Sequence, residues 1–191
     1  MITHLTGRLI EKNPTEIVVE CAGIGYLVKI SLNTFSQITN DESIKIYTQF
    51  IVREDAQLLY GFADKAERDM FNLLISVSGI GPNTAILMLS SLTPSEVATA
   101  IGSEDVTTIQ GVKGIGLKTA QRVIVDLKDK MLKFGLIEES GTITNNTIRF
   151  DALTALVSLG FDKKTAEKSL NRVFAEQATV ELLIKDALKV L

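Results

Sequence analysis

The chain has 191 residues, 46% of them hydrophobic, with a formal net charge of −3, one cysteine (Cys21) and one histidine (His4). This length and apolar content suit one to three packed domains, while so few cysteines and histidines exclude an internal disulfide, a Cys/His zinc site and an iron–sulfur cluster, so we expect no metal and no cofactor. No apolar run approaches the roughly 18 residues of a membrane helix and no signal-peptide pattern opens the chain, which predicts a cytoplasmic protein with no membrane partner.

Residues 1–62 predict a small β-barrel. The segment contains short runs rich in Val, Ile, Tyr and Thr that turn residues separate: TGRLIEK, TEIVVECAG, GYLVKISL, ESIKIYTQFIV and AQLLYGF. Five such strands favour closure into a barrel, because closure removes exposed sheet edges. The Gly-Ile-Gly at 23–25 lies between two of these runs, so we interpret it as a hairpin turn.

From residue 64 the pattern becomes helical. Asp64 with Glu67 predicts a capping box at the start of the helix KAERDMFNLLISV, and the stretch TPSE at 93–96 predicts a second one. Pro82 suits the first turn of the helix PNTAILMLSSL, where its missing N–H costs nothing. A short helix is expected next, followed by a long one over 117–132.

The stretch SGIGPNTA at 78–85 returns 35 residues later as KGIGLKTA at 113–120, each time between two predicted helices. Glycines permit the positive φ angles that reverse the chain tightly, and they leave room for a ligand near the backbone. The helix after each turn directs its free N–H groups and its positive dipole end at that room. Ordinary helix packing would explain one copy, but two matched copies predict two phosphate contacts on a nucleic-acid backbone.

The charge is distributed unevenly along the chain. Residues 1–64 carry five basic and eight acidic residues, whereas residues 113–133 carry two acidic and these six basic residues: Lys113, Lys118, Arg122, Lys128, Lys130 and Lys133. The local positive field surrounds the second copy of the repeat and favours a polyanionic partner. The stretch GVKGIGLKT there resembles a nucleotide-binding P-loop, but Leu117 is inserted before the lysine and no strand precedes it, so we expect no ATPase site.

The polar stretch GLIEESGTITNNT has no helical period and predicts a linker. Three short helices follow, IRFDALTALVSLG, DKKTAEKSLNRVFA and TVELLIKDALKVL, with Asp162 and Thr179 as caps of the last two. The predicted fold is α+β and multidomain, with four segments in chain order: an OB-fold-like five-stranded barrel (1–63), an all-α tandem helix-hairpin-helix domain (64–134), a flexible linker (135–147) and a small three-helix domain (148–191).

These features together make the chain resemble the RuvA family of bacterial proteins. The resemblance covers the opening GRL, the strand GYLV, the stretch VREDAQLLYGF, both hairpin copies, the linker and the C-terminal helices. It implies a homotetramer that binds four-way (Holliday) DNA junctions and holds them open and nearly flat. The hexameric RuvB ATPase then migrates the branch point in homologous recombination, in DNA repair and in the SOS response to DNA damage. ATP hydrolysis would reside in RuvB, so we expect no catalytic residue in this chain.

The resemblance also implies the DNA-binding residues, which are hairpin positions and one loop arginine: Gly79, Gly81, Asn83, Thr84, Gly114, Gly116, Lys118, Thr119, Arg122 and Arg53. The chain departs from the family at Asn83, where a lysine often follows Gly-Pro, and at Leu117, where a second lysine can occur. Asparagine still donates a hydrogen bond to phosphate but brings no charge. We therefore expect Lys118 and Arg122, beside the second hairpin, to contribute more to DNA binding than the first hairpin does.

Glu54 and Asp55 match the acidic pin of the family. Two adjacent loop carboxylates usually just face solvent, but a tetramer would gather eight of them around the axis where junction phosphates converge. Repulsion there would keep the crossover open and disfavour plain duplex, which gives specificity for junctions. Arg53 beside them would offset part of the repulsion by touching a phosphate.

The last three helices are implied to bind RuvB through apolar side chains, with these candidates: Leu153, Leu156, Leu182 and Leu183. Some apolar residues of this domain must form its own core, and the sequence does not separate the two groups. The resemblance further implies that the RuvC resolvase shares the junction. It leaves open whether one tetramer or two stacked tetramers bind each junction.

Two other functions are weighed against this interpretation. A base-excision glycosylase also uses a helix-hairpin-helix, but its catalytic aspartate usually lies well downstream, whereas Asp126 is only ten residues past Gly116 in the same predicted helix. Asp126 is better interpreted as a surface charge near Lys130, four residues on. A generic duplex-binding scaffold with the same fold stays open, and competition between junction and linear duplex separates it from a junction-binding protein.

Overall fold

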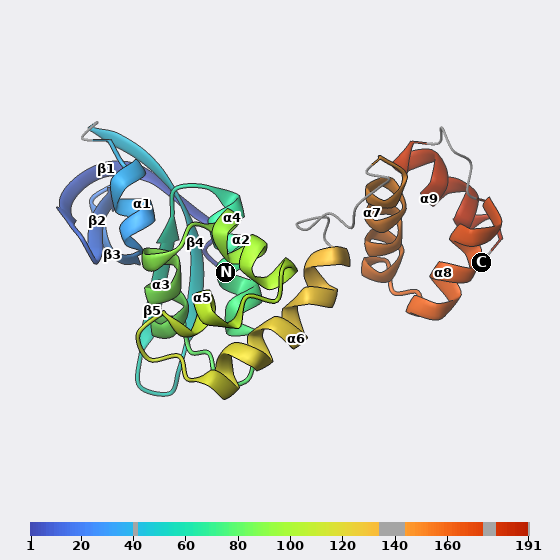
Figure 1. The fold of residues 1–191 in the computed structure, drawn as a ribbon. Helices are drawn as coiled ribbons and strands as arrows, with labels where there is room; N and C mark the ends of the chain where they lie inside the picture. Colours follow the sequence, from blue (N-terminus) through green and yellow to red (C-terminus); the bar gives the residue numbers. More distant parts are fainter. Residues whose placement is uncertain (40–41, 134–143, 174–178, 191) are drawn as a thin grey trace. The chain divides into compact units, whose positions relative to one another are not determined.

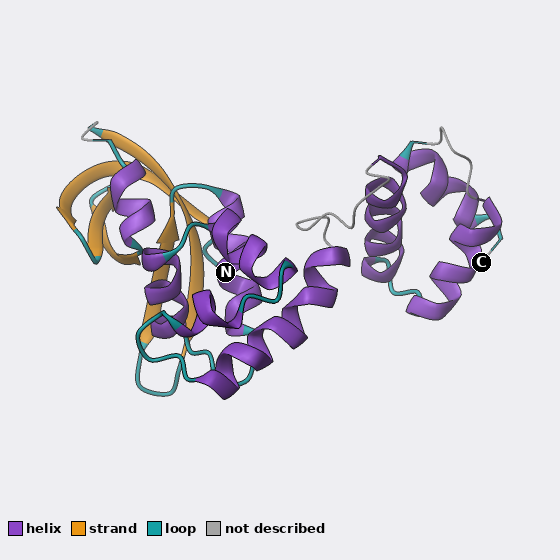
Figure 2. Ribbon diagram, viewed as in Figure 1, coloured by secondary structure: helices purple, strands orange, loops and turns teal. Residues whose placement is uncertain are grey.

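The computed structural model describes residues 1–39, 42–133, 144–173 and 179–190 (Figure 1). The chain divides into two compact units, Met1–Lys128 and Asp129–Leu191, and each is described by itself. Figure 2 shows that the strands belong to the first unit, which also carries helices, and that the described part of the second unit is helical. The predicted α+β multidomain architecture is confirmed.

Five strands close into a barrel in the order β1-β2-β3-β5-β4. Their bounds are β1 (His4–Asn13), β2 (Glu16–Cys21), β3 (Ile24–Ile30), β4 (Ser43–Val52) and β5 (Gln57–Phe62). The paired strands are antiparallel except for β3 and β5, which run parallel. Alternate residues of β2, Ile17 and Val19, point inward and are fully buried with Val28 and Ile46 of neighbouring strands. The predicted barrel is confirmed.

The connection from β2 to β3 is a two-residue hairpin turn at Ala22 and Gly23, whose φ angles are +52° and +84°. Positive φ at both central residues matches the twist of the flanking strands, so the hairpin interpretation of this Gly-Ile-Gly is confirmed. The sequence did not predict α1 (Leu32–Gln37), because it extended the third strand through residue 32. Ser31 ends that strand and caps the helix, since its hydroxyl accepts the Thr34 N–H at 2.9 Å.

Further helices follow the barrel: α2 (Lys65–Ile75), α3 (Pro82–Ser91), α4 (Pro94–Gly102), α5 (Val106–Gln110) and α6 (Leu117–Lys133). Pro82 is the first residue of α3, as predicted. At the start of α4 the Thr93 hydroxyl accepts the Glu96 N–H at 3.3 Å, and the Glu96 carboxylate accepts the Thr93 N–H at 2.7 Å. This confirms the capping box there, and the hydrogen bonds that the Thr93 N–H and hydroxyl donate to the carboxylate lower the pKa of Glu96.

The capping box predicted at the start of α2 forms only by half. The Asp64 carboxylate accepts the Glu67 N–H at 2.8 Å. The predicted second bond, from the Asp64 N–H to the Glu67 carboxylate, is wrong. The Glu67 carboxylate is fully buried and turns to the start of α1, where it accepts hydrogen bonds from the hydroxyls of Ser31 and, at 2.5 Å, Thr34. These bonds join α2 to the N-terminus of α1, which follows directly after β3. The barrel and the helices that follow it, as far as Lys128, lie in one compact unit.

The second unit contains the three predicted helices, α7 (Thr144–Ser158), α8 (Lys163–Val173) and α9 (Val180–Leu188). α7 begins inside the predicted linker, whose residues 144–147 are helical. Polar Thr and Asn are common at helix starts, so the missing apolar period hid this first turn. The linker residues before it lie outside the described residues. Asp162 and Thr179 accept backbone N–H groups of α8 and α9 at 3.1 and 3.3 Å, which confirms both caps.

None of the described helices is by itself long and apolar enough to cross a membrane. Taken together, α3 and α4 would be long and apolar enough by length and composition alone, but the two helices meet at an angle of 95°. Both helices bury apolar side chains, among them Met88 and Ile101.

Candidate nucleic-acid interface

The two sequence repeats fold into matching turns, which we name the first hairpin (residues 78–85) and the second hairpin (residues 113–120). The first glycine of each has a positive φ, +98° at Gly79 and +90° at Gly114. In each hairpin the isoleucine N–H donates at 3.1 Å to the carbonyl of the valine three residues earlier. The repeat in the sequence is therefore also a repeat in structure.

Both hairpins turn their apolar side chains inward and their glycine backbone outward. The apolar residues are buried in each copy: Ile80, Ala85, Ile115 and Ala120. The second glycines, Gly81 and Gly116, are exposed, and a Cβ built on either would meet no atom within 4 Å. A ligand can thus approach the backbone closely at both turns, as the sequence predicts.

Each hairpin leads into a helix whose N-terminus faces this open backbone. α3 begins directly after Gly81, and no side chain caps it. α6 begins directly after Gly116 and is 17 residues long. The free N–H groups of a first turn and the positive end of the helix dipole together favour an anion. The two hairpins therefore have the geometry of phosphate sites.

The positive charge near this surface belongs to the second hairpin. Lys113, Lys118 and Arg122 are all exposed there. Lys128, which the sequence counts in the same basic field, is paired with Glu104, since its Nζ lies 2.5 Å from the carboxylate. The hydrogen bond and the charge of Lys128 lower the pKa of Glu104. Lys128 therefore adds less to the field than its position in the sequence suggests.

One hydrogen bond joins the first hairpin to the helix that follows the second. The guanidinium group of Arg122, in α6, donates to the carbonyl oxygen of Ser78 at 3.4 Å. Gly79 also lies near the second hairpin, since a Cβ built on it would be 4.0 Å from Cγ2 of Thr119. The two candidate phosphate sites therefore adjoin. Arg122 is accordingly a structural link between the hairpins as well as a predicted DNA contact.

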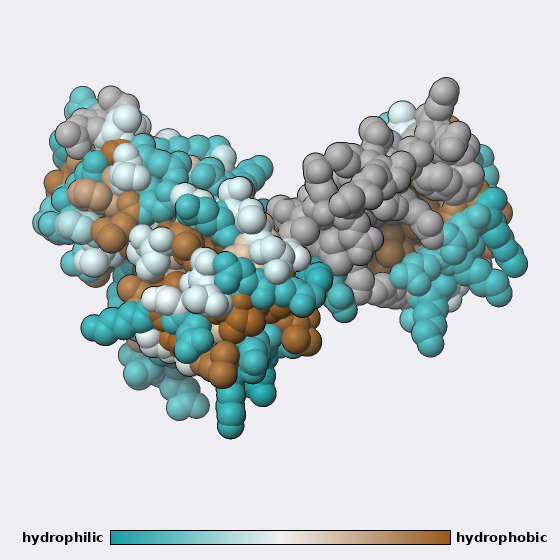
Figure 3. Space-filling view, in the orientation of Figure 1, coloured by the Kyte–Doolittle hydropathy of each residue, from teal (hydrophilic) through white to brown (hydrophobic). Residues whose placement is uncertain are grey.

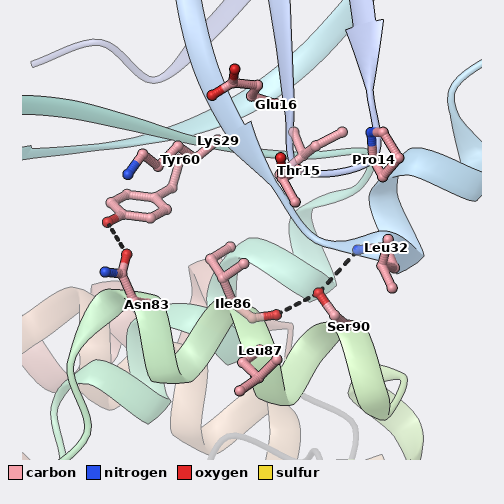
Figure 4. Close-up of a pocket in the computed structure, with 11 residues that line it drawn as sticks. Pro14, Thr15, Glu16, Lys29, Leu32, Tyr60, Asn83, Ile86, Leu87 and Ser90 are labelled. Atoms are coloured by element: carbon pink, nitrogen blue, oxygen red, sulfur yellow. Dashed lines mark hydrogen bonds between the residues drawn. The ribbon is translucent and has the colours of Figure 1, made fainter.

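Asn83, in the first turn of α3, is tied to the barrel. The buried Tyr60 hydroxyl donates to Asn83 Oδ1 at 3.2 Å (Figure 4). Burial raises the pKa of Tyr60, while the nearby charge of Arg53 acts in the opposite direction. The sequence did not predict this contact. The one sequence feature that could have pointed to this contact is the strand QLLYGF, whose alternation places the tyrosine on the inward, core-facing side.

Arg53, Glu54 and Asp55 lie together at the tip of the β4–β5 hairpin. The Arg53 N–H donates to the Ala56 carbonyl at 2.8 Å and closes the loop. All three side chains are exposed. They are therefore accessible to a ligand, and the pin function of the two carboxylates stays a prediction.

The second unit divides the predicted partner-binding leucines into buried and exposed ones. Leu156 and Leu183 are 0% and 1% exposed and form its core, because α7, α8 and α9 pack their apolar faces on one another. Leu153 is partly buried against this core, whereas Leu182 is 50% exposed. Other exposed apolar side chains lie on α7 and α9 or directly after them: Val157, Leu159, Leu188 and Val190. Figure 3 shows, by contrast, a hydrophilic surface over α8.

A closed barrel followed by two adjoining hairpins with open glycine backbone defines a helix-hairpin-helix nucleic-acid-binding protein. Within the described part of the chain, no group of His, Cys, Asp and Glu is placed to hold a metal ion. Family models match in the same order: the RuvA N terminal domain over residues 1–61, the SAM-like helix-hairpin-helix tandem over 71–129 and the RuvA C-terminal domain over 148–191.

Curated relatives match the chain along its length. The Holliday junction branch migration complex subunit RuvA of Christiangramia forsetii is 56% identical over 191 residues, which cover 99% of each chain. The proteins of the same name from Flavobacterium psychrophilum and Cytophaga hutchinsonii are each 51% identical, again over 99% of both chains. The chain belongs to the RuvA family.

Proposed function

We propose that the chain binds four-way DNA junctions as a homotetramer, holds them open and nearly flat, and recruits the RuvB ATPase for branch migration in recombination and repair. Family membership supports this, since the relatives are named subunits of the Holliday junction branch migration complex. In this proposal the barrel (1–63) and the hairpin domain (64–134) hold DNA, the stretch 135–147 connects them to the rest, and residues 148–191 hold the motor. The chain contributes no catalytic group.

The paired hairpins carry the proposal. Both expose backbone near a positive helix end, and Lys118 and Arg122 add charge beside the second one. Contacts of this kind bind phosphates and position a protein on DNA without reading bases. A protein that acts on junctions of any sequence needs this form of recognition.

A gel shift tests the proposal with a synthetic four-way junction and a linear duplex built from its arms, each at two salt concentrations. We expect tighter binding to the junction and an affinity that falls steeply with salt, because bound phosphates release counterions. Equal affinity for the two DNAs would favour a generic duplex-binding scaffold. Incubation with damaged duplex should release no base, and base release would favour a glycosylase.

The carboxylates of Glu54 and Asp55 are proposed to act as the pin. Their exposed position at one loop tip supports this, and a tetramer would bring four such tips to the centre of the junction. Glu54→Gln with Asp55→Asn keeps the side-chain size and removes the charge. Duplex affinity should rise about three- to tenfold, with a smaller preference for the junction, because the repulsion against duplex phosphates is removed.

The matched control for the pin is Glu11→Gln with Glu42→Gln, which neutralises two exposed carboxylates elsewhere on the barrel. This variant should leave the ratio of junction to duplex affinity unchanged. If both double variants shift that ratio equally, overall charge and not the loop tip sets the preference.

The second unit is proposed to bind RuvB through its exposed apolar side chains, Leu182 among them. A chain ending at Phe134 should keep its junction affinity within about twofold, since both hairpins remain, and should no longer stimulate ATP hydrolysis by RuvB. Leu182→Glu in the full chain should reduce the stimulation without unfolding the unit. Branch migration at the full rate by the shortened chain would assign the motor contact to another surface.

We further propose that RuvC acts on the same bound junction and that the complex works in the cytoplasm, where chromosomal DNA is available. Sedimentation of the protein–junction complex distinguishes one bound tetramer from two stacked on opposite faces. A second tetramer would cover the face of the junction that RuvC needs. RuvC cleavage measured at rising protein concentration therefore tests both points together.

A further inference from the structure

We propose that Tyr60 is a positioning residue for DNA, whose hydroxyl holds the Asn83 amide so that Asn83 Nδ2 donates to a backbone phosphate at the first hairpin. This inference rests on the proposed junction binding. It explains how the first hairpin, which has no basic residue in SGIGPNTA, contacts the DNA.

The geometry of the amide sets the direction of its donor. An asparagine side chain has one acceptor oxygen and one NH₂ donor group on the same planar carbon. Because Asn83 Oδ1 accepts from the Tyr60 hydroxyl at 3.2 Å, the NH₂ group points away from that hydroxyl. Figure 4 shows the amide nitrogen turned away from the tyrosine ring. Asn83 is exposed, so this donor is available to a ligand.

Tyr60 itself is held firmly. Its side chain is 1% exposed, and its ring centroid lies 5.2 Å from that of Phe71. The phenol hydroxyl is protonated at neutral pH and remains a donor, and burial raises its pKa further above the ordinary value of 10.0. The tyrosine is thus a fixed point on the barrel from which an exposed surface amide can be oriented.

Packing alone does not hold Asn83. The residue lines a pocket of about 380 Å³ between the barrel and α3, together with Tyr60, Ile86, Leu87 and Ser90 (Figure 4). Because Asn83 is exposed beside this pocket, we infer that the hydrogen bond, more than packing, sets the orientation of its amide. Because the amide is already oriented in the free protein, less side-chain entropy is lost when Asn83 binds the DNA.

The direction matters more for an amide than for a lysine. Lysine carries a full charge on a flexible stem and attracts phosphate from many positions. A neutral amide contributes only through a well-aligned hydrogen bond. The phosphate at the first hairpin would then meet Asn83 Nδ2 together with the free N–H groups of an N-terminus that no side chain caps.

The test is a double-mutant cycle in junction affinity with Tyr60→Phe, Asn83→Ala and the pair. Each single variant should weaken binding about three- to tenfold, the effect of removing one hydrogen bond. The pair should be no weaker than Asn83→Ala alone, since Tyr60 acts through the asparagine. Asn83→Lys should raise the magnitude of the salt slope by about 0.9, the effect of one more neutralised phosphate, and make Tyr60→Phe neutral.

Ser90→Ala is the control for the packing of α3 on its neighbours. The Ser90 hydroxyl accepts the Leu32 N–H at 3.0 Å and donates to the Ile86 carbonyl at 2.7 Å, so it ties the same helix to the start of α1 without touching Asn83. This variant should bind junctions within about twofold of the unmodified chain. An unchanged affinity in Tyr60→Phe, or a weakening that persists in the Asn83→Ala background, overturns the inference. Failure of the unmodified chain to bind junctions contradicts the proposed function instead.

Discussion

Glu67→Ala should lower the free energy of unfolding of the first unit by about 2–4 kcal/mol. The Glu67 carboxylate is fully buried and accepts hydrogen bonds from the hydroxyls of Ser31 and Thr34, both of which are also fully buried. Alanine would leave the two hydroxyls without this acceptor and open a cavity between α2 and the start of α1. Each buried hydroxyl that loses its partner costs about 1–3 kcal/mol.

Tyrosine fluorescence during urea unfolding measures this destabilisation. The chain has three tyrosines and no tryptophan. Tyr26, Tyr47 and Tyr60 all lie in barrel strands, so their signal reports on the first unit alone. Glu11→Ala, at an exposed barrel carboxylate, is the control and should change the stability by less than about 0.5 kcal/mol. Equal stability of the two variants would mean that the buried hydrogen bonds contribute nothing net.

The same carboxyl predicts a pH dependence. Burial raises the pKa of Glu67 above its ordinary value of 4.5, against the opposing effect of its hydrogen bonds from Ser31 and Thr34. A raised pKa in the folded state means that folding favours the protonated form. Its contribution to stability is therefore complete below the unfolded value and is lost as pH rises through the folded value. Relative to Glu67→Gln, which does not titrate, the unmodified chain should gain stability as the pH falls from 7 toward 4.5.

Much of the fold follows from local patterns in the sequence. Alternating Val and Ile predict the strands, and the repeat of Gly-Ile-Gly before two helices predicts both hairpins. The caps at Thr93, Asp162 and Thr179 are predictable because a capping residue and its target lie within three or four positions. In each case the interaction that decides the structure is local, so the sequence displays it directly.

The tertiary interactions that the sequence missed join residues far apart in the chain. Glu67 has a partner three residues away in the expected capping box, yet hydroxyls more than 30 residues earlier bind it instead. Likewise Tyr60 finds Asn83 only because α3 packs beside the barrel. The apolar leucines of the last helices could not be divided into core and surface for the same reason. Burial depends on how the three helices pack on one another, and the hydrophobic pattern of one helix does not show that packing.

Lys118→Glu with Arg122→Glu should weaken junction binding by at least about a hundredfold and reduce the magnitude of d log K/d log[salt] by about 0.9 for each phosphate that the variant no longer neutralises. Both residues are exposed at the second hairpin, next to the N-terminus of α6. The first hairpin has no basic side chain to compensate for the reversal. The weakening should be the same for arms of any sequence, because phosphate contacts carry no base information. Affinity measured at four salt concentrations gives the slope.

The control is Lys164→Glu with Arg172→Glu, which makes the same change in charge on the exposed face of α8. It should leave the slope unchanged, because the second unit is not expected to touch DNA. Arg122→Lys separates the two functions of that arginine. It keeps the charge, so the slope should persist, while the bond from the guanidinium to the Ser78 carbonyl is removed. If Arg122→Lys weakens binding as much as the charge reversal does, the arginine acts by joining the hairpins, and its charge is secondary.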